Sequence, residues 1–357
     1  MSSPTPGRGA PSAHVPHRFG LASRESDLDW LDLVEDIDGP GPKLRTTVTE
    51  EHARTILSFN KSPDIGFNRS INAYRGCEHG CVYCFARPSH AYHDLSPGLD
   101  FETKLFAKPN AAALLRQTLA KPGYKPAPIA MGTNTDPYQP IEARYRITRA
   151  ILEVCLEARH PVTITTKSAR VLTDLGLLTE LARHNLVAVG ISVTSLDPKL
   201  SGLLEPRASA PAKRLAALAE LAAAGIPTHL MLAPVIPAIT DSFMEEILRS
   251  AAAQGVRSAS WIVVRLPHEV APLFREWLGV HYPDRATKVM NTIRSIRGGR
   301  DNDPGFFTRM KPHGVWAELF RARFRLACRR LGLNRERNAL DMSQFRRPNV
   351  DGQLALL

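Results

Sequence analysis

Three of the five cysteines in this 357-residue chain lie within one stretch of eight residues, at Cys77, Cys81 and Cys84. The spacing C-x3-C-x2-C allows their thiolates to converge on one centre from a single loop. A disulfide framework needs an even set of cysteines and an oxidising compartment, and the low, odd and clustered set here does not fit one. The three thiols therefore predict a metal centre.

Two kinds of metal centre suit three clustered thiolates. Tetrahedral zinc needs a fourth ligand, which His79, His90 or His93 could supply. Structural zinc sites usually pair two C-x2-C knuckles, however, and the sequence has no second knuckle. In a [4Fe–4S] cluster bound by three thiolates, one iron lacks a protein ligand and is open to a substrate or cofactor.

The composition is that of a globular protein, with 43% hydrophobic and 23% charged residues, and the length suits one large domain or two ordinary ones. The N-terminus has no apolar signal region, and no stretch approaches the roughly 18 uninterrupted apolar residues of a membrane span. We therefore expect no contact with a membrane and a cytoplasmic, reducing setting for the thiols. The formal net charge of +11 favours polyanionic partners such as nucleic acid.

A repeating order of strand and helix begins near residue 70. Apolar strands are expected to start near residues 70, 128, 161, 187, 227 and 259, and a helical pattern follows each of them. Strands that are apolar almost throughout are typical of a buried parallel sheet, which winds into a barrel or a doubly wound sheet. Polar side chains follow several successive strands, which favours an α/β fold with a partial (β/α)6 TIM-like barrel that gathers them at one mouth.

The rest of the chain divides around this repeat. Residues 1–64 form an irregular N-terminal segment, in which residues 1–25 are expected to be disordered and residues 51–56 to form a short helix. Residues 65–280 form the core domain. Residues 281–357 form a basic helical C-terminal extension, because twelve arginines and one lysine face six acidic residues from Ser295 onward.

One helix is expected in this extension, over residues 314–332. Its apolar face indicates that it packs against the core, and its arginines could contact phosphates. The apolar face holds Trp316, Phe320, Phe324, Ala327 and Leu331, and the arginines are Arg321, Arg325, Arg329 and Arg330. The alternative is that the helix only covers the open side of the barrel.

The cysteine loop, CEHGCVYC, resembles the radical S-adenosylmethionine (SAM) signature C-x3-C-x-aromatic-C, with Tyr83 as the aromatic residue. It follows the first expected strand, where members of that superfamily carry it. The stretches YRGCEHGCVYCFARP, MGTNTDPYQPIE and TITTKS are similar to the branch that includes spore photoproduct lyase, and RFRLACRRLGLNRER is similar to a bacterial subgroup of that branch. The resemblance covers about residues 65–280.

This resemblance implies an activity and its cofactors. A [4Fe–4S] cluster on Cys77, Cys81 and Cys84 would be the catalytic centre, and its open iron would bind the amino and carboxylate groups of SAM. One electron from a flavodoxin- or ferredoxin-type donor would cleave SAM to methionine and a 5′-deoxyadenosyl radical. The radical would abstract hydrogen from an unidentified substrate, with nucleic acid as one candidate. The family fold, a partial barrel of six βα units, agrees with the strand count.

The resemblance also implies which side chains bind SAM. A lysine at a strand end suits the carboxylate as a point charge, and hydroxyls at strand ends suit the carboxylate or the ribose. Amide and hydroxyl residues after the second strand suit the ammonium group, and the aromatic residue of the signature would lie beside the adenine. The lysine is Lys167, and the hydroxyls at strand ends are those of Ser168 and Ser192. The residues after the second strand are Asn134 and Thr135, and the aromatic residue is Tyr83.

Other polar residues near the same strand ends have less defined roles. Arg75 and Arg87 flank the cysteines, where they would either tune the charge of the cluster or lie at the surface. Glu205 and Arg207 follow the fourth strand and could contact the ribose or the substrate.

Two functions remain open at this point. The first is a radical SAM enzyme, and the alternative is a zinc-stabilised nucleic-acid-binding protein without catalysis. Spore photoproduct lyase returns a hydrogen atom from a cysteine near its second strand, and IAMGTNTDPYQ contains none, so dimer reversal by that route is not implied. Cys155 and Cys328 lie in helical patterns and are expected to be packing residues.

Overall fold

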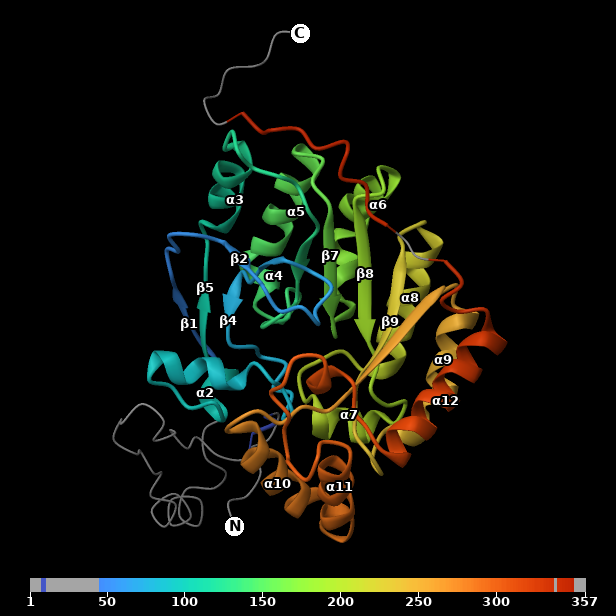
Figure 1. Ribbon diagram of the computed structural model, residues 1–357. Helices are drawn as coiled ribbons and strands as arrows, with labels where there is room; N and C mark the ends of the chain where they lie inside the picture. Colours follow the sequence, from blue (N-terminus) through green and yellow to red (C-terminus); the bar gives the residue numbers. More distant parts are fainter. Residues whose placement is uncertain (1–7, 11–44, 337–338, 350–357) are drawn as a thin grey trace.

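The computed structural model describes residues 8–10, 45–336 and 339–349, and its main feature is a seven-stranded sheet in the order β10-β9-β8-β7-β6-β3-β2 (Figure 1). All neighbouring pairs from β3 to β10 are parallel and follow chain order, as successive βα units require. These strands are β3 (Arg69–Ile71), β6 (Ile129–Met131), β7 (Val162–Thr166), β8 (Val187–Ser192), β9 (Thr228–Val235) and β10 (Ser258–Val263). The predicted strands and the α/β class are confirmed, and the short β2 (Leu57–Phe59), antiparallel to β3, is added to them.

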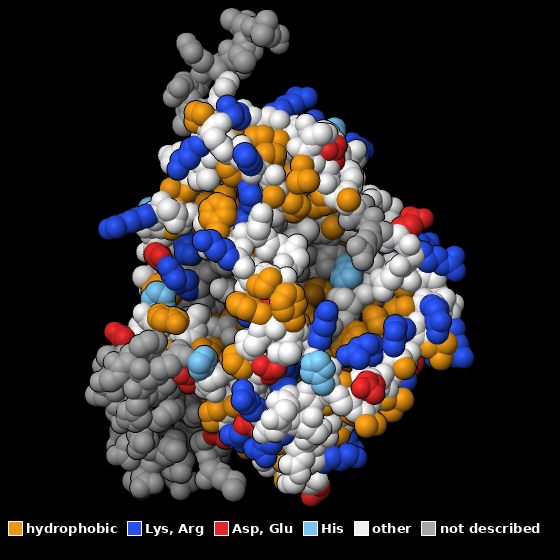
Figure 2. All heavy atoms as spheres, viewed as in Figure 1, with side chains coloured by type: hydrophobic (Ala, Val, Ile, Leu, Met, Phe, Trp, Pro, Cys, Tyr) orange, Lys and Arg blue, Asp and Glu red, His pale blue; other side chains and the backbone are white. Residues whose placement is uncertain are grey.

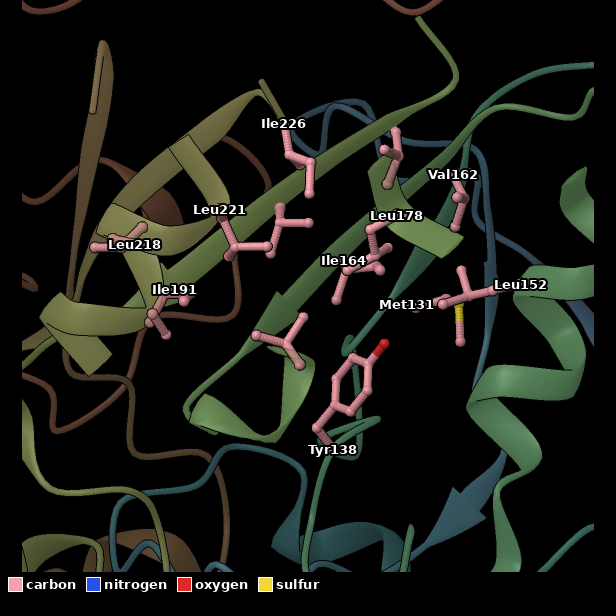
Figure 3. Close-up of a cluster of buried hydrophobic side chains, with 14 of the residues drawn as sticks. Met131, Tyr138, Leu152, Val162, Ile164, Leu178, Ile191, Leu218, Leu221 and Ile226 are labelled. Atoms are coloured by element: carbon pink, nitrogen blue, oxygen red, sulfur yellow. The ribbon is translucent and has the colours of Figure 1, made fainter. Parts of the chain in front are cut away.

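Helices follow these strands and cover one face of the sheet (Figure 1). They include α3 (Ala111–Ala120), α5 (Ile147–Glu157), α6 (Leu175–Arg183), α8 (Pro211–Ala223) and α9 (Met244–Ala253). The core lies between them and the sheet, where Ile164 and Ile191 of the strands and Leu178 and Leu218 of the helices are buried (Figure 3). Each buried side chain of this kind stabilises the fold by about 1.5–3 kcal/mol relative to exposure, so the strand ends are held on a rigid base.

Some helices differ from the predicted patterns. The pattern over residues 142–160 is interrupted at Arg146, whose left-handed φ of +50° ends α4 (Glu142–Tyr145) before α5 begins. The pattern over residues 169–185 begins as the 3-10 helix η3 (Ala169–Asp174) and continues as α6. The short helix expected over residues 51–56 is wrong, because this segment is irregular and leads into β2.

Three further helices lie at the carboxyl end of the sheet (Figure 1). The helix α10 (Val270–His281) matches the last helical pattern of the core, whereas α7 (Pro198–Leu204) and α11 (Pro283–Ser295) were not expected. The side chain of Asp197 accepts the backbone N–H groups of Lys199 and Leu200 at the start of α7, which is ordinary N-cap chemistry.

A second, three-stranded sheet lies next to the start of the cysteine loop, and no sequence pattern predicts it. Its order is β1 (Thr47–Glu50), β5 (Lys104–Ala107) and β4 (Tyr74–Arg75). Strands of two to four residues carry too little periodicity to be recognised, and their partners come from distant parts of the chain. Since β4 ends at Arg75, this sheet fixes the backbone just before Cys77.

The predicted C-terminal helix is confirmed as α12 (Val315–Leu331), which packs on α9 and on the β10 edge of the large sheet (Figure 1). Its buried face includes Phe320, whose ring lies 4.8 Å from that of Trp261 in β10. Beyond the helix, the side chain of Asn334 bonds both the N–H and the carbonyl oxygen of Ala259, at 2.8 and 2.9 Å. The extension therefore covers a sheet edge that would otherwise offer unpaired backbone groups.

The chain continues from α12 across the amino ends of the strands (Figure 1). The backbone N–H groups of Asp341 and Arg346 donate to the carbonyl oxygens of Asn185 and Ala158, and Phe345 packs beside Tyr124. No helix in the described ranges is both long enough and apolar enough to cross a membrane. Most of residues 1–25, for which disorder was expected, lie outside the described residues.

Candidate active site

The cysteine loop lies at the carboxyl edge of the parallel sheet. It contacts the segments that follow β6, β7 and β8, which the parallel register brings to this edge. The ring of His79 lies 3.3 Å from the carboxylate of Asp136, which also accepts the backbone N–H of Lys167 at 2.7 Å. The backbone N–H of Val82 donates to the carbonyl oxygen of Leu204 at 3.1 Å. The predicted gathering of polar strand ends is confirmed.

The three thiols of this loop are free and shielded from solvent. Cys77 and Cys81 are 7% and 8% exposed, and Cys84 is half-buried. Burial raises the pKa of each thiol, and the carboxylates of Asp136 and Glu205 raise the pKa values of Cys77 and Cys81 further. The protein alone therefore disfavours three thiolates side by side, and a strongly positive centre is what would hold them ionised. This donor set fits a metal cluster.

Arg87 holds the cysteine loop from its buried side. The residue begins the 3-10 helix η2 (Arg87–His93), is fully buried, and uses each of its five guanidinium N–H groups. The acceptors are the carbonyl oxygens of Gly80, Cys81, Pro97 and Gly98, at 2.9–3.0 Å, and Oε1 of Glu102 at 2.5 Å. The surface position considered for Arg87 is therefore wrong, because the side chain is buried and fixes the carbonyl groups of Gly80 and Cys81, at the second cysteine.

Asp136 fastens the same loop to the ends of β6 and β7. Its carboxylate accepts Thr166 Oγ1 at 2.6 Å and the N–H groups of Lys167 and Tyr138 at 2.7 and 2.9 Å. Burial opposes its ionisation, but the imidazole of His79 and these hydrogen bonds outweigh burial and lower the pKa of Asp136. The carboxylate is thus committed to positioning the backbone around the cysteines.

Glu205 forms a second buried polar centre behind the aromatic residue of the loop. It is 1% exposed, and its oxygens contact the Tyr83 hydroxyl, the Arg214 guanidinium and, at 3.0 Å, Thr194 Oγ1. Burial alone would raise the pKa of Glu205, but Arg214, Lys167 and the Tyr83 hydroxyl lower it to about 2. The ribose contact considered for Glu205 is not available, because protein groups surround this carboxylate.

Lys167 follows β7 and points to the same place. Its Nζ donates to the carbonyl oxygen of Ala233 at 2.9 Å, lies 3.9 Å from Glu205 Oε1, and lies 5.9 Å from the ring centre of Tyr83. The side chain is 15% exposed, so its charge is largely shielded from water. The structure therefore brings together two of the residues expected to contact SAM, Lys167 and Tyr83.

The other residues predicted to bind SAM lie at nearby strand ends, and they differ in burial and in their hydrogen bonds to the protein. Ser192 ends β8, is buried, and offers its carbonyl oxygen to Arg214. Thr135 is buried and its hydroxyl faces the carbonyl oxygen of Tyr74 at 3.5 Å, whereas Asn134 is exposed. The hydroxyl of Ser168 accepts the N–H of Arg170 and begins η3, so it is used within its own turn.

The histidines considered as zinc ligands have other contacts. His79 faces Asp136, and His90 Nε2 lies 2.9 Å from the carbonyl oxygen of Lys104. Within the described ranges, no group of three or more His, Cys, Asp or Glu side chains is arranged to hold a metal ion. The described residues therefore do not show the Cys3His arrangement that was considered as one alternative.

Cys155 and Cys328 are confirmed as packing residues. Both thiols are buried in helices of the main hydrophobic core, and burial raises the pKa of each, to about 12 and about 11. Both are buried cysteine thiols outside the cysteine loop, so they can serve as references for it.

Comparison with known proteins identifies relatives of this arrangement. The family model for the Radical SAM superfamily matches residues 71–251, which include the cysteine loop. "Uncharacterized protein Rv2578c" of Mycobacterium tuberculosis (strain H37Rv) is 36% identical over 242 residues, which cover 66% of this chain and 71% of that protein. "Uncharacterized protein MJ0683" of Methanocaldococcus jannaschii is 29% identical over 189 residues, which cover 53% of this chain and 68% of that protein.

Solved structures show the same architecture. Spore photoproduct lyase complexed with dinucleoside spore photoproduct is similar with a TM-score of 0.58 and 16% sequence identity, over 80% of this chain and 81% of that chain. A point mutant of that enzyme gives a TM-score of 0.57 at 17% identity, over the same shares of the two chains. At this level of identity the likeness shows a shared fold, and function has to be argued from the site.

The substitution Glu205→Gln should lower the free energy of unfolding of the apo protein at neutral pH by about 3–5 kcal/mol, because it leaves the buried Arg214 without its counter-charge. The pKa of Glu205 is about 2 in the folded state and near 4.5 when unperturbed, so this stabilisation is complete above pH 4.5 and is lost as the pH falls toward 2. Urea unfolding at a series of pH values should show the difference between wild type and variant narrowing across this window.

The matched control is Glu220→Gln, which removes an exposed carboxylate from α8. This control should leave the free energy of unfolding close to that of the wild type throughout. A wild-type advantage over Glu205→Gln that stays constant from neutral pH down to pH 3 would contradict the assigned charge of Glu205.

Proposed function

The chain belongs to the radical SAM superfamily, and we propose that Cys77, Cys81 and Cys84 bind the [4Fe–4S] cluster that this family of enzymes uses together with SAM. The observation that carries the proposal is a signature loop with three free thiols, two buried and one half-buried, at the carboxyl edge of a parallel sheet. Each thiolate of a cluster binds a different iron, so the thiols need not converge on one ion as zinc ligands must. The zinc-stabilised alternative without catalysis is set aside, because the chain is a radical SAM enzyme.

When bound, the cluster supplies the electron that cleaves SAM to methionine and the 5′-deoxyadenosyl radical, which abstracts hydrogen from the substrate. The contribution of this chain is to hold the thiols and keep water away from them. Arg87 and Asp136 fix the backbone on two sides of the loop, and the burial of Cys77 and Cys81 limits solvent access. Exclusion of water protects a reactive radical from side reactions.

We assign SAM binding to the residues around Lys167. Its ammonium lies 5.9 Å from the ring centre of Tyr83 and suits the SAM carboxylate, and the ring of Tyr83 provides an apolar surface for the adenine. Asn134 and Thr135 are assigned to the ammonium group, and Ser192 at the end of β8 to the ribose. Ser168 shapes the turn after β7 from which Lys167 projects.

The architecture proposed for this function is a partial barrel of six βα units. The strand order from β3 to β10 supports it, since each unit lies beside the next. Residues 65–280 would be the core domain, residues 281–357 the C-terminal extension and residues 1–64 the N-terminal segment. A flavodoxin- or ferredoxin-type donor in a reducing cytoplasm completes the proposal, because free thiols and a reduced cluster need such a setting.

A nucleic acid is the macromolecular partner that the exposed arginines of α12 favour. Arg325, Arg329 and Arg330 are exposed, and none pairs with a carboxylate in the part of the chain that the structure describes. Figure 2 shows Lys and Arg side chains gathered over this side of the molecule. The last turn of α12 lies near the start of β10, at the edge opposite the cysteine loop, so we propose that these arginines hold a phosphate backbone away from the reacting group.

The substitution Cys81→Ala should abolish cluster assembly. After anaerobic reconstitution, the wild type should hold about four irons per chain and form 5′-deoxyadenosine from SAM and dithionite. The variant should retain far less iron and form no 5′-deoxyadenosine, because two thiolates cannot hold the cluster against solvent. Cys155→Ala is the matched control and should keep both properties, and product formation by Cys81→Ala would overturn the assignment.

The substitution Lys167→Met should weaken SAM binding by roughly tenfold to a hundredfold, because it removes one charge-assisted hydrogen bond. Equilibrium dialysis of SAM against the reconstituted protein measures this, and the iron content should be unchanged. Lys213→Met, which alters an exposed residue of α8, is the control. Equal affinity in Lys167→Met and wild type would remove Lys167 from the SAM site.

The triple substitution Arg325→Gln, Arg329→Gln and Arg330→Gln should reduce the salt dependence of binding to duplex DNA. The slope of log K against log salt concentration should become shallower by about 2–3, since each phosphate contact contributes roughly 0.9. Fluorescence anisotropy at several salt concentrations measures the slope. Arg323→Gln is the control on the same helix, because Arg323 is already paired with Glu245. An unchanged slope would contradict the proposed contact.

A further inference from the structure

A tripeptide near the N-terminus packs on the cysteine loop. Arg8, Gly9 and Ala10 lie outside residues 71–251, which the family model matches, and their composition predicts no burial. Ala10 is nevertheless 1% exposed, which differs from the disorder expected for residues 1–25. We refer to Arg8–Ala10 as the N-terminal strap.

The strap binds Glu102, the counter-charge of Arg87. The backbone N–H groups of Gly9 and Ala10 donate to the two oxygens of the Glu102 carboxylate, at 3.0 and 2.7 Å. The Arg8 guanidinium also donates to the carbonyl oxygen of Glu102 at 3.1 Å. Because Glu102 pairs with Arg87, and Arg87 holds the carbonyl groups of the loop, the strap is connected to the loop through buried, charge-assisted hydrogen bonds.

The strap also touches the loop directly. A Cβ atom placed on Gly9 would lie 1.7 Å from the carbonyl oxygen of Gly80 and 3.2 Å from the backbone N of Val82. No side chain fits there, so backbone packs on backbone between the first and second cysteines. Gly80 also has no room for a side chain. Its φ is +65°, and a Cβ atom placed on it would lie 2.6 Å from Glu102 Oε2.

A second connection passes through Glu78, which lies between the same two cysteines. Its carboxylate accepts Thr46 Oγ1 at 2.7 Å and pairs with Arg207 at 2.8 Å. The Arg8 guanidinium donates to the same Thr46 hydroxyl at 3.2 Å. Glu78 is therefore held by residues that all lie outside the cysteine loop in sequence.

We propose that the N-terminal strap is a positioning element of the cysteine loop. It completes the hydrogen bonds of Glu102, holds the segment between Cys77 and Cys81 in place, and excludes water from that side of the loop. Gly9 is the position on which this role depends, because only glycine allows the close approach to Gly80. The inference rests on the proposed cluster site for its functional meaning, but its test needs no cluster.

The test uses the full-length apo protein and measures how fast N-ethylmaleimide labels each cysteine, read by peptide mass spectrometry. Gly9→Ala should increase the labelling rates of Cys77 and Cys81 at least tenfold, with Cys155 as the internal reference. The matched control is Gly123→Ala, since a Cβ atom at Gly123 meets nothing within 4 Å. Equal labelling rates in Gly9→Ala and wild type would overturn the proposal.

Hydrogen exchange of the wild-type protein gives a second test that does not depend on a variant folding. The amides of Gly9 and Ala10 donate to a buried carboxylate, so they should exchange at least a hundredfold more slowly than an unstructured peptide. Exchange at the peptide rate would also overturn the proposal. If the strap tests fail but Cys81→Ala still loses its iron, the strap proposal is wrong and the cluster assignment stands. If Cys81→Ala retains its iron, the cluster assignment is wrong and the strap proposal is unaffected.

Discussion

The buried ion pair between Arg87 and Glu102 is the interaction on which the cysteine loop depends. Both side chains are fully buried, and two charges removed from water are costly unless their hydrogen bonds are complete. Here they are complete: five donors of Arg87 meet five acceptors, and Glu102 receives backbone N–H groups as well. Val82 and Tyr83 pack in a hydrophobic cluster, whereas Glu78, His79 and Gly80 offer no apolar side chain. In that half of the loop, a charged pair with many directed bonds takes the place of packing.

Glu205 and Arg214 play the same part on the opposite side of the loop. Arg214 donates to the carbonyl oxygens of Ser192 and Ser209 and to Glu205, which in turn meets the hydroxyl of Tyr83. The end of β8, the start of α8 and the signature aromatic residue are thus joined in one network. Burial between these two networks raises the pKa values of the Cys77 and Cys81 thiols, so the positive charge of the proposed cluster would have to offset the cost of deprotonation.

The large sheet links this chemistry to the ends of the chain. Parallel strands place Asp136, Lys167 and Ser192 at one edge because every strand in the repeat runs in the same direction. The C-terminal extension covers the β10 edge and then crosses the amino ends of the strands, where Phe345 packs beside Tyr124. Because the end of α12 lies near the start of β10, its exposed arginines lie away from the cysteine loop, and the phosphate contact proposed for them would be separate from the proposed cluster.

The sequence by itself determined the βα repeat, the helix α12 and the grouping of Cys77, Cys81 and Cys84 in one loop, since these depend on local spacing: period-3.6 faces, apolar strands and a compact cysteine motif. Lys167 was found because a polar residue that ends a parallel strand must reach the carboxyl edge. Only the tertiary structure decided the partners of Arg87 and Glu205 and the burial of Gly9, because each depends on contacts between residues far apart in sequence, and no local pattern encodes them. The three-stranded sheet was missed for the same physical reason, since strands so short gain their stability from distant partners rather than from their own residues.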